Sequence, residues 1–329
     1  MGLSYKILWV DDQIEELIDY GLQANIKQYL TDLGFEPYIE SFEDIASAEQ
    51  YLSSKKYDLI LSDYNISESG NGDVLIRRVR EGKIYTEVLF YSAQANFDAI
   101  AKSLYQDRVS FISISAQDGY DKLEEKAKWL IDQTLTKLQE IESIRGLVMA
   151  ETSRLDDLVK ATLIIYFESS SENKSQLRKS ILKSIHDSLR SNFYKNGELK
   201  LESKDNAEIV QSRLFDASKM ARSIKELIDL EKINQDDVQF ENFFENYKKD
   251  ILDPRNDLAH AKASIDENGR EYLSVTTQGS EKKILFDHVK VVEIRRNLSK
   301  YNKLLLTLQG KISSTFSSTI IDPRNWTTC

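Results

Sequence analysis

The stretch Ile7-Leu8-Trp9-Val10-Asp11-Asp12 decides the fold of the N-terminal part of the chain. Four apolar residues followed by two carboxylates predict a short strand that ends in acidic side chains. A second stretch, Leu59-Ile60-Leu61-Ser62-Asp63, repeats this order, and a third, Phe90-Tyr91-Ser92-Ala93, places a hydroxyl group where the others have a carboxylate. Polar groups therefore end three of the expected strands.

Short apolar runs alternate with amphipathic stretches between residues 5 and 115. We expect strands at residues 6–10, 36–41, 57–62, 88–92 and 109–114, and helices at 14–33, 45–53, 73–81, 97–105 and from 120 onward. Five strands that alternate with helices predict an α/β fold in which helices cover both faces of a parallel sheet.

The carboxyl edge of this sheet is where such a fold holds its site. Asp11, Asp12, Asp63 and Ser92 all lie at strand ends, so we expect their side chains to meet there. Three clustered carboxylates are unfavourable unless a cation neutralises them, and hard oxygen ligands suit Mg²⁺. The sequence therefore predicts a Mg²⁺ site and makes phosphoryl transfer reasonable; the alternative is an acidic sheet edge without chemistry.

In the three stretches at residues 7–12, 59–63 and 90–93, the chain resembles the receiver domain of two-component response regulators, which has a five-stranded flavodoxin-like fold. The resemblance covers residues 4–122. The resemblance implies that Asp63 accepts a phosphoryl group, with a histidine kinase or another regulatory protein as partner. It also implies that Asp11, Asp12 and Asp63, with the Asn65 carbonyl, hold Mg²⁺ when the domain is phosphorylated, and that the Ser92 hydroxyl meets the phosphate. We place the receiver-like domain at residues 1–122.

One position departs from the receiver pattern. Members of that family carry a lysine at the end of the fifth strand, whereas residues 111–116 here read Phe-Ile-Ser-Ile-Ser-Ala, and no lysine lies between Arg108 and Lys122. A receiver that acts without phosphorylation, through a partner that docks on its acidic edge, is therefore an alternative.

Length and composition limit the class of protein. A chain of 329 residues predicts about two domains, and 41% hydrophobic residues are enough for packed cores. The single cysteine, Cys329, argues against a disulfide framework and a thiolate metal cluster. No apolar run approaches the length that spans a membrane, and residues 1–6 do not begin a signal peptide, so we expect a cytoplasmic protein with no membrane partner.

The negative charge is concentrated in the N-terminal part. Residues 1–135 contain 13 Lys and Arg against 24 Asp and Glu, a net charge of −11, whereas the remainder contains 31 against 30, a net charge of +1. The C-terminal part is therefore compatible with a local basic surface and a nucleic-acid partner.

The C-terminal two-thirds has a helical pattern. Residues 120–167 predict one long helix, or two with a break near Gly146, in which residues 123–135 connect the domains and the apolar stripe could pair in a dimer. We expect further helices at 176–194, 207–231, 240–262 and 288–307, strands at 263–266 and 271–277, and a third strand at 284–286. This predicts a helical bundle with a small β-hairpin at residues 136–308, followed by a loosely held tail at 309–329.

The stretch Asp253-Pro254-Arg255-Asn256-Asp257-Leu258-Ala259-His260 brings a guanidinium, an amide and an imidazole within six residues. It predicts either one helix kinked at Pro254 or a helix that stops and restarts there, with Asp253 as the cap of the new helix. Asn256 and His260 share a helix face, because they are four residues apart. Such groups near a helix N-terminus can hold a phosphate beside a proton-transfer group.

Residues 136–308 resemble the HEPN domain, a helical family of ribonucleases and nucleotide-binding proteins, on Arg255, Asn256 and His260 placed before a hairpin. The resemblance implies a homodimeric, metal-independent endoribonuclease that cleaves RNA. His260 would transfer a proton, Arg255 would stabilise charge on the phosphate and Asn256 would position groups around them. Fusion to a receiver suggests an effector of signalling, stress or phage defence.

Three alternatives remain open for the helical part. In the first, the bundle acts as a non-catalytic adaptor that binds a protein or nucleotide. In the second, Arg255 forms a surface ion pair with Asp257 or Asp253 and His260 is a partly buried structural residue, because many HEPN-like domains bind or dimerise without cutting RNA. The pair His186-Asp187, on an amphipathic run, offers a third hypothesis, in which His186 accepts a phosphoryl group in a phosphorelay.

Overall fold

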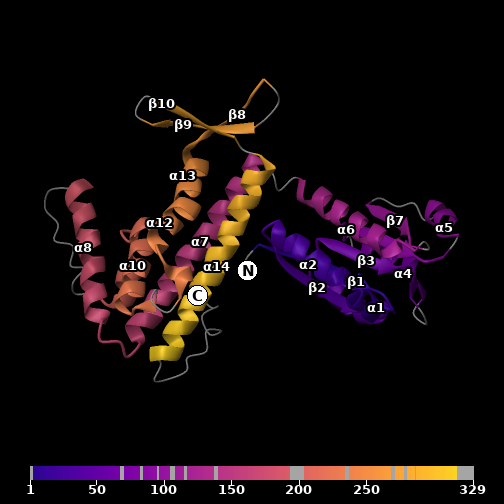
Figure 1. Cartoon of the computed structure of the whole chain (residues 1–329), viewed down its shortest axis with the longest axis horizontal. Coiled ribbons are helices and arrows are strands. Elements are labelled where there is room, and N and C mark those ends of the chain that lie inside the picture. The colour runs from indigo at the N-terminus through magenta and orange to yellow at the C-terminus, as the bar shows by residue number, and fades with distance from the viewer. Residues whose placement is uncertain are drawn as a thin grey trace. The chain divides into compact units, whose positions relative to one another are not determined.

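Strand β1 (Ser4–Val10), which contains the apolar run of the opening motif, belongs to a five-stranded parallel sheet in the computed structural model of the chain (Figure 1). The structure describes residues 3–66, 70–81, 84–94, 96–103, 108–114, 117–136, 140–192, 204–233, 237–267, 271–277, 280–285 and 287–316. The chain divides into two units, residues 1–144 with 291–296, and residues 145–290 with 297–329.

The sheet of the first unit has the strand order β2-β1-β3-β6-β7, with every neighbouring pair parallel. Its other strands are β2 (Glu36–Phe42), β3 (Leu59–Asp63), β6 (Glu87–Ser92) and β7 (Val109–Ser113). This order is the flavodoxin-like one, so the predicted α/β fold with five parallel strands is confirmed. The register sets Val10 opposite Ser62 and Asp63 opposite Tyr91, which aligns the strand ends.

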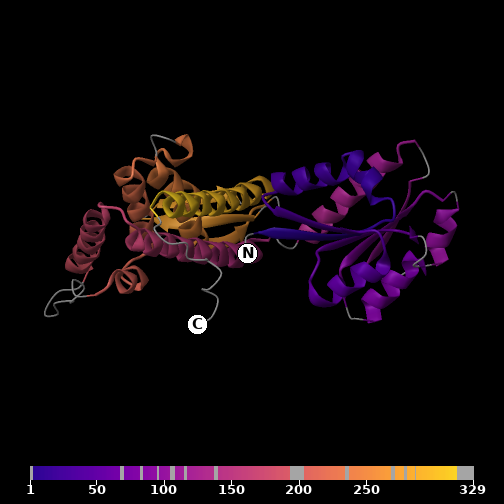
Figure 2. The same cartoon turned by 90° about the horizontal axis from the view of Figure 1, so that it is seen from below.

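Helices cover both faces of this sheet (Figure 2). They are α1 (Ile14–Asp19), α2 (Leu22–Asp32), α3 (Ile45–Ser54), α4 (Gly72–Glu81), α5 (Phe97–Ser103) and α6 (Gly119–Leu135). On one face, Ile45 of α3, Leu75 of α4 and Phe97 of α5 share a core cluster with Leu8 and Phe90 of the strands. Helices α2 and α6 pack together on the other face.

The predicted helix at residues 14–33 is interrupted at Gly21, which has a φ of 90° and precedes the first residue of α2. Glycine adopts this left-handed conformation without the steric cost that a Cβ atom adds. Two short strands, β4 (Asn65–Ile66) and β5 (Gly70–Asn71), pair in antiparallel fashion after β3.

The rest of the chain is mostly helical (Figure 1). Its helices are α7 (Ile141–Glu168), α8 (Lys174–Asn192), α9 (Asn206–Gln211), α10 (Ala217–Leu230), η2 (Val238–Phe240), α12 (Phe243–Tyr247), η3 (Lys248–Leu252), α13 (Asp253–His260) and α14 (His288–Phe316). None of the described helices is both long and apolar enough to cross a membrane.

The predicted break near Gly146 does not occur, because α7 continues through this residue. A glycine inside a helix costs about 1 kcal/mol relative to alanine. The buried stripe of Ile144, Val148 and Leu155 offsets that cost. Instead, α6 ends at Leu135 and α7 begins at Ile141.

The segment around Pro254 is a continuous helix with a π-helical turn, rather than a helix that restarts. Residues of η3 have π-helical hydrogen bonding, and Asp253 and Pro254 follow in helical conformation at the start of α13. Proline has no N–H group, so it interrupts the α-helical hydrogen-bond ladder, and a π turn accommodates the interruption. The predicted cap by Asp253 is wrong: its carboxylate accepts hydrogen bonds from Lys248 Nζ at 3.0 Å.

After α13 the chain forms a three-stranded antiparallel sheet of β8 (Lys262–Ile265), β9 (Glu271–Thr277) and β10 (Ser280–Leu285), in the order β10-β9-β8. The predicted hairpin and third strand are therefore present. The closing helix α14 continues to Phe316, beyond residue 308, where the predicted helical domain ends. The predicted tail from residue 317 lies outside the described residues.

Candidate functional site

Three carboxylates meet at the carboxyl edge of the parallel sheet. Asp11 and Asp12 follow β1, and Asp63 ends β3, the neighbouring strand. One carboxylate oxygen from each of the three lies within 4.8 Å of the others, with Asp11 buried and the other two half-buried. Cα register alone brings these side chains together, because both strands end at the same height of the sheet.

A buried hydrogen-bonded chain fixes Asp11. The Trp9 Nε1–H donates to the Tyr91 hydroxyl at 2.7 Å, and this hydroxyl donates to Asp11 Oδ2. The backbone N–H of Gln13 donates to the other oxygen, Asp11 Oδ1, at 2.7 Å. These hydrogen bonds to both oxygens fix the orientation of the Asp11 carboxylate beside its two acidic neighbours.

Sequence reasoning missed Tyr91 and Trp9, because both stand in apolar runs and have the pattern of core residues. Both are indeed buried, at 1% and 0% exposure. A buried tyrosine hydroxyl or indole N–H usually has a hydrogen-bond partner, and the strand register that sets Tyr91 opposite Asp63 is the signal that could have placed it at the acidic edge.

Replacing Tyr91 by Phe should lower the free energy of unfolding by about 1–3 kcal/mol, because it leaves the buried Trp9 Nε1–H and an oxygen of Asp11 without their shared partner. Urea titration followed by tryptophan fluorescence measures the change. Tyr20→Phe is the matched control, since Tyr20 donates to Asp121 at 2.9 Å on the exposed surface. An equal effect of the two substitutions would contradict the role of the buried chain.

Burial is the main cause that raises the pKa of Asp63 from 3.8 to about 7, and the charges of Asp11 and Asp12 act in the same direction. Burial also raises the pKa of Asp11, against the opposing effect of the Tyr91 hydrogen bond. The three carboxylates therefore resist simultaneous ionisation when no cation is present. A divalent cation removes this cost, so the acidic triad fits a Mg²⁺ site.

These pKa values predict that, without Mg²⁺, the chain loses stability as pH rises from about 4 to about 7. In this window the folded state holds a proton on Asp63 that the unfolded chain has released. The rise from 3.8 to about 7 sets an upper bound of ~4 kcal/mol, which solvent screening of the half-buried group reduces to on the order of 1–2 kcal/mol.

Urea titrations at pH 5 and pH 8, each in EDTA and in excess Mg²⁺, measure this pH dependence. The loss at pH 8 should be smaller in Mg²⁺, because the cation binds the ionised carboxylates. Asp118→Asn is the control, since Lys122 holds the pKa of the exposed Asp118 below its usual value. A chain that is equally stable at both pH values in EDTA would rule out the raised pKa of Asp63.

Ser92 is fully buried at the end of β6, beside the acidic triad. The Asn65 side-chain amide donates to Ser92 Oγ at 3.0 Å, and the Gln94 backbone N–H donates to the same oxygen at 3.2 Å. In both contacts Ser92 is the acceptor, so neither uses its own hydroxyl hydrogen. That hydrogen can be donated to an anionic oxygen bound near Asp63.

Asn65 follows Asp63 at the same edge. Its backbone N–H donates to Asp63 Oδ1 at 3.3 Å, while its side-chain oxygen accepts from Gln94 Nε2 at 2.8 Å. The sequence did not indicate that the Asn65 side chain would connect the β3 end to Ser92. The family's lysine would be expected at the end of β7. In the structure β7 ends at Ser113, which pairs with Ser92, and residues 115 and 116 lie outside the described residues.

Residues 7–118 match the family described as the response regulator receiver domain. This part of the chain is a receiver domain, and a receiver domain implies a two-component signalling regulator with a histidine kinase as partner. No curated protein matches the chain.

Solved structures similar to the chain include the signal receiver domain of an HD domain-containing protein from Pseudomonas fluorescens Pf-5, with 18% identity, a TM-score of 0.32, and coverage of 42% of this chain and 93% of that one. A receiver domain of a Francisella response regulator has 18% identity, a TM-score of 0.31, and coverage of 40% and 99%. A response regulator receiver protein from Sinorhizobium medicae WSM419 has 20% identity, a TM-score of 0.31, and coverage of 40% and 95%.

The second candidate site lies on α13. Asn256 and His260 are exposed, as their four-residue spacing allows, and Arg255 is half-buried against α7. The guanidinium of Arg255 lies 3.6 Å from the carboxylate of Asp156, so the structure pairs it with neither Asp253 nor Asp257. Burial raises the pKa of Asp156, and the charge of Arg255 acts in the opposite direction.

Arg145 of α7 is a second arginine near this site. Its Nη2 donates to the carbonyl of Ala261 at 2.5 Å, immediately after His260, while its Nε is buried with no partner in the part of the chain that the structure describes. Sequence reasoning missed both Arg145 and Asp156, because more than 90 residues separate them from α13. Together they attach the two ends of α13 to α7.

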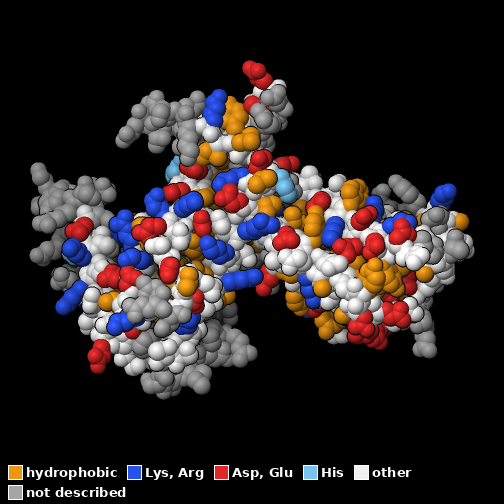
Figure 3. Space-filling model, in the orientation of Figure 1, with side chains coloured by type: hydrophobic (Ala, Val, Ile, Leu, Met, Phe, Trp, Pro, Cys, Tyr) orange, Lys and Arg blue, Asp and Glu red, His pale blue; other side chains and the backbone are white. Residues whose placement is uncertain are grey.

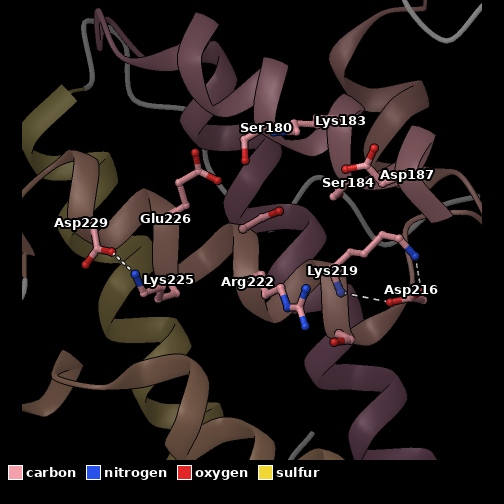
Figure 4. Close-up of a pocket in the computed structure, with 12 residues that line it drawn as sticks. Ser180, Lys183, Ser184, Asp187, Asp216, Lys219, Arg222, Lys225, Glu226 and Asp229 are labelled. Carbon is pink, nitrogen blue, oxygen red and sulfur yellow. Dashed lines mark hydrogen bonds and ion pairs between the residues drawn. The ribbon is translucent and has the colours of Figure 1, made fainter.

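A polar groove of about 740 Å³ lies between α8 and α10 (Figure 4). Its lining side chains are serines and charged groups of both signs: Ser180, Lys183, Ser184, Asp187, Asp216, Ser218, Lys219, Arg222, Ser223, Lys225, Glu226 and Asp229. Lys219 pairs with Asp216, and Lys225 pairs with Asp229 at 2.6 Å. Its lining contains four basic and four acidic side chains, so the groove has no net charge.

His186, the phosphorelay candidate, is an exposed residue of α8. Its neighbour Asp187 lines the groove between α8 and α10, one position away. The described contacts of α8 therefore place the aspartate, rather than the histidine, among the groove residues.

Proposed function

We propose that the chain is a receiver-regulated, metal-independent endoribonuclease. The receiver would occupy residues 1–122, a helical connector residues 123–135, and a HEPN-like domain residues 136–308. The observation that carries the proposal is the exposure of Asn256 and His260 on one face of α13, beside an arginine that Asp156 holds in place. Two copies of the chain would act together as a homodimer, in a signalling, stress or phage-defence response.

The proposed cleavage needs only groups of the RNA and of α13. The ribose 2′-oxygen attacks the neighbouring phosphorus, and the bond from phosphorus to the next 5′-oxygen breaks. His260 takes the proton from the 2′-hydroxyl, and the imidazolium formed in this way donates it to the leaving 5′-oxygen. Arg255, whose side chain keeps 30% of its surface exposed, stabilises the negative charge that develops on the phosphate. The products are a 2′,3′-cyclic phosphate and a 5′-hydroxyl.

At the other site, Asp63 would accept the phosphoryl group. A carboxylate oxygen of Asp63 attacks the phosphorus of a phosphohistidine, the phosphorus–nitrogen bond breaks, and the imidazole nitrogen of the kinase takes a proton. Bound Mg²⁺, held by Asp11, Asp12, Asp63 and the Asn65 carbonyl, would supply positive charge to the phosphoryl oxygens. Ser92 would donate its hydroxyl hydrogen to one of them. Helices α6 and α7 join the two sites along the chain.

Incubation of the purified full-length chain with a mixed RNA pool, with and without acetyl phosphate, tests this function. We expect cleavage whose rate changes with the phosphoryl donor, and fragments that end in a 2′,3′-cyclic phosphate. RNA that stays intact under both conditions would refute the nuclease.

The second candidate function is a non-catalytic adaptor whose bundle binds a nucleotide or a protein. The groove between α8 and α10 favours it, because serines and paired charges suit a ligand with both phosphate and hydroxyl groups. The ion pair of Arg255 with Asp156 is also compatible with a structural role for that arginine. Recovery of one stoichiometric protein partner without RNA would support the adaptor, and cyclic-phosphate products would exclude it.

A further inference from the structure

The three-stranded sheet after α13 has one face whose composition differs from that of the other. Strand pairing sets Lys262, Ser274 and Lys283 in one row across the sheet, and Ser264, Tyr272 and Leu285 in the next. Because side chains alternate along a strand, all six belong to one face. We call these six residues the basic face.

The opposite face is the one that carries the core of the sheet. Leu273, which pairs with Ala263 and Ile284, is buried at 2% exposure, and β9 packs against α13. The sheet therefore has a reason to form that does not involve the basic face. The residues of the basic face are half-buried or exposed, with Lys262, Lys283 and Leu285 exposed.

A cation and an aromatic ring adjoin on this face. The ammonium of Lys283 lies 5.0 Å from the centre of the Tyr272 ring, and Leu285 extends the apolar surface beside Tyr272, its partner in the register. Lys262 and Lys283 stand two strands apart in one row, at about 10 Å between their Cα atoms. Figure 3 shows basic and hydrophobic side chains beside one another on this sheet.

The positive charge of this face contrasts with the chain as a whole, which has a net charge of −10. The two rows that make up the basic face contain two lysines and no carboxylate. The next row on the same side of the sheet pairs Thr276 with Glu281. An aromatic ring with flanking lysines is suited to a polyanion whose flat rings are accessible, which is the chemistry of single-stranded nucleic acid. In a duplex the bases are stacked on each other, so Tyr272 would have no ring to stack on.

The basic face is close to the proposed catalytic histidine along the chain. Lys262 begins β8 only two residues after His260, so their Cα atoms lie within about 7 Å of each other. An RNA strand bound across the lysine row would therefore enter the surroundings of His260.

We propose that the basic face is a binding platform for single-stranded RNA, which delivers the strand to His260. Lys262 and Lys283 contact phosphates, and Tyr272 stacks on a base. The delivery of RNA to His260 rests on the proposed nuclease function, but binding of RNA to the basic face can be measured without cleavage.

The test uses the full-length chain with His260→Ala, so that RNA stays intact, and a fluorescein-labelled oligouridine of about 12 nucleotides, titrated by anisotropy at about 50 to 200 mM salt. Lys262→Gln with Lys283→Gln should weaken binding by about 10-fold and lower the slope of log affinity against log salt by about 1.4. Lys179→Gln with Lys249→Gln, at two exposed lysines elsewhere, is the matched control. Tyr272→Leu should weaken binding about 10-fold, whereas Tyr272→Phe, which keeps the ring, should not.

The outcomes separate the platform from the nuclease. Affinity that the lysine pair and Tyr272→Leu leave unchanged, or equal affinity for single-stranded and duplex RNA, overturns the platform even if the chain with His260 cuts RNA. Binding that depends on these residues in a chain that never cuts RNA supports the platform and refutes the nuclease. No measurable binding of the oligouridine also overturns the platform. Circular dichroism of each variant identifies one that fails to fold, and the lysine pair, being exposed, provides the result in that case.

Discussion

Replacing His260 by Ala should lower the rate of RNA cleavage by the full-length chain by about 100-fold or more, because proton transfer by a positioned side chain contributes 10²–10⁴-fold to such reactions. His260 is exposed, so its loss should leave the fold intact. Gel analysis of an end-labelled RNA gives the rate, and the affinity of the variant for the oligouridine shows whether binding is retained.

His186→Ala is the matched control for this prediction, since His186 is also an exposed histidine on a helix of the same unit. It should cut RNA at the rate of the unaltered chain. If His260→Ala retained full activity, α13 would not be the catalytic element. If both variants kept the same slow rate, the cleavage would come from a contaminating nuclease.

The fold of the first unit could be predicted from sequence because each strand carries its own signal. The apolar run before Asp11 and the run before Asp63 both end in a carboxylate, and parallel pairing forces these ends to the same edge of the sheet. Proximity of the three carboxylates follows from the topology alone. No knowledge of side-chain packing was needed.

Contacts between distant side chains were not predictable in the same way. Tyr91 stands in an apolar strand, and its hydroxyl donates to Asp11, which lies 80 residues away in the sequence. The pairing of the strands brings the two side chains together, and no local pattern indicates it. Arg255 offers the clearer case: sequence distance favoured Asp253 or Asp257 as its partner, whereas Asp156 of α7 is the residue that faces it. Helix packing, rather than spacing within one helix, decides such pairs.

The backbone around Pro254 illustrates a third limit. The sequence indicated a disturbance, because proline cannot donate to the helical ladder, but it did not distinguish a restart from a π turn. In the structure the Lys248 ammonium donates to both carboxylate oxygens of Asp253, so this carboxylate does not cap the helix. The result is that α13 continues from the helical segment before it, and Arg255 is positioned by Asp156 rather than by a free helix N-terminus.

Control of the proposed nuclease depends on what the acidic edge does without the family's lysine. The pKa of Asp63 is raised to about 7 chiefly by burial, so without a cation this carboxyl is only about half ionised at neutral pH. Mg²⁺ binding by the triad would raise the ionised fraction, and in the proposed transfer the Ser92 hydroxyl and the Asn65 amide, which are hydrogen-bonded to each other, would contact the incoming phosphoryl group. For the proposed phosphoryl transfer the edge therefore offers a carboxylate nucleophile, ligands for a cation and a hydroxyl donor.

Replacing Asp63 by Asn should reduce Mg²⁺-dependent incorporation of a phosphoryl group from labelled acetyl phosphate to background, a loss of at least about 100-fold, because an amide oxygen is a far weaker nucleophile than a carboxylate. Intact-mass analysis after incubation measures the phosphorylated fraction. The rate of RNA cleavage by Asp63→Asn should be the same with and without the phosphoryl donor.

Asp58→Asn is the control, since it makes the same chemical change before the opposite end of β3, where the side-chain oxygen can still accept from the Lys6 N–H. It should be phosphorylated as the unaltered chain is. If Asp58→Asn and Asp63→Asn were labelled equally, the phosphoryl group would reside on another residue. If the unaltered chain took up no label in Mg²⁺ while Asp63→Asn still changed the cleavage rate, the acidic edge would regulate by binding a partner or a cation, and the absence of the lysine would be the physical reason.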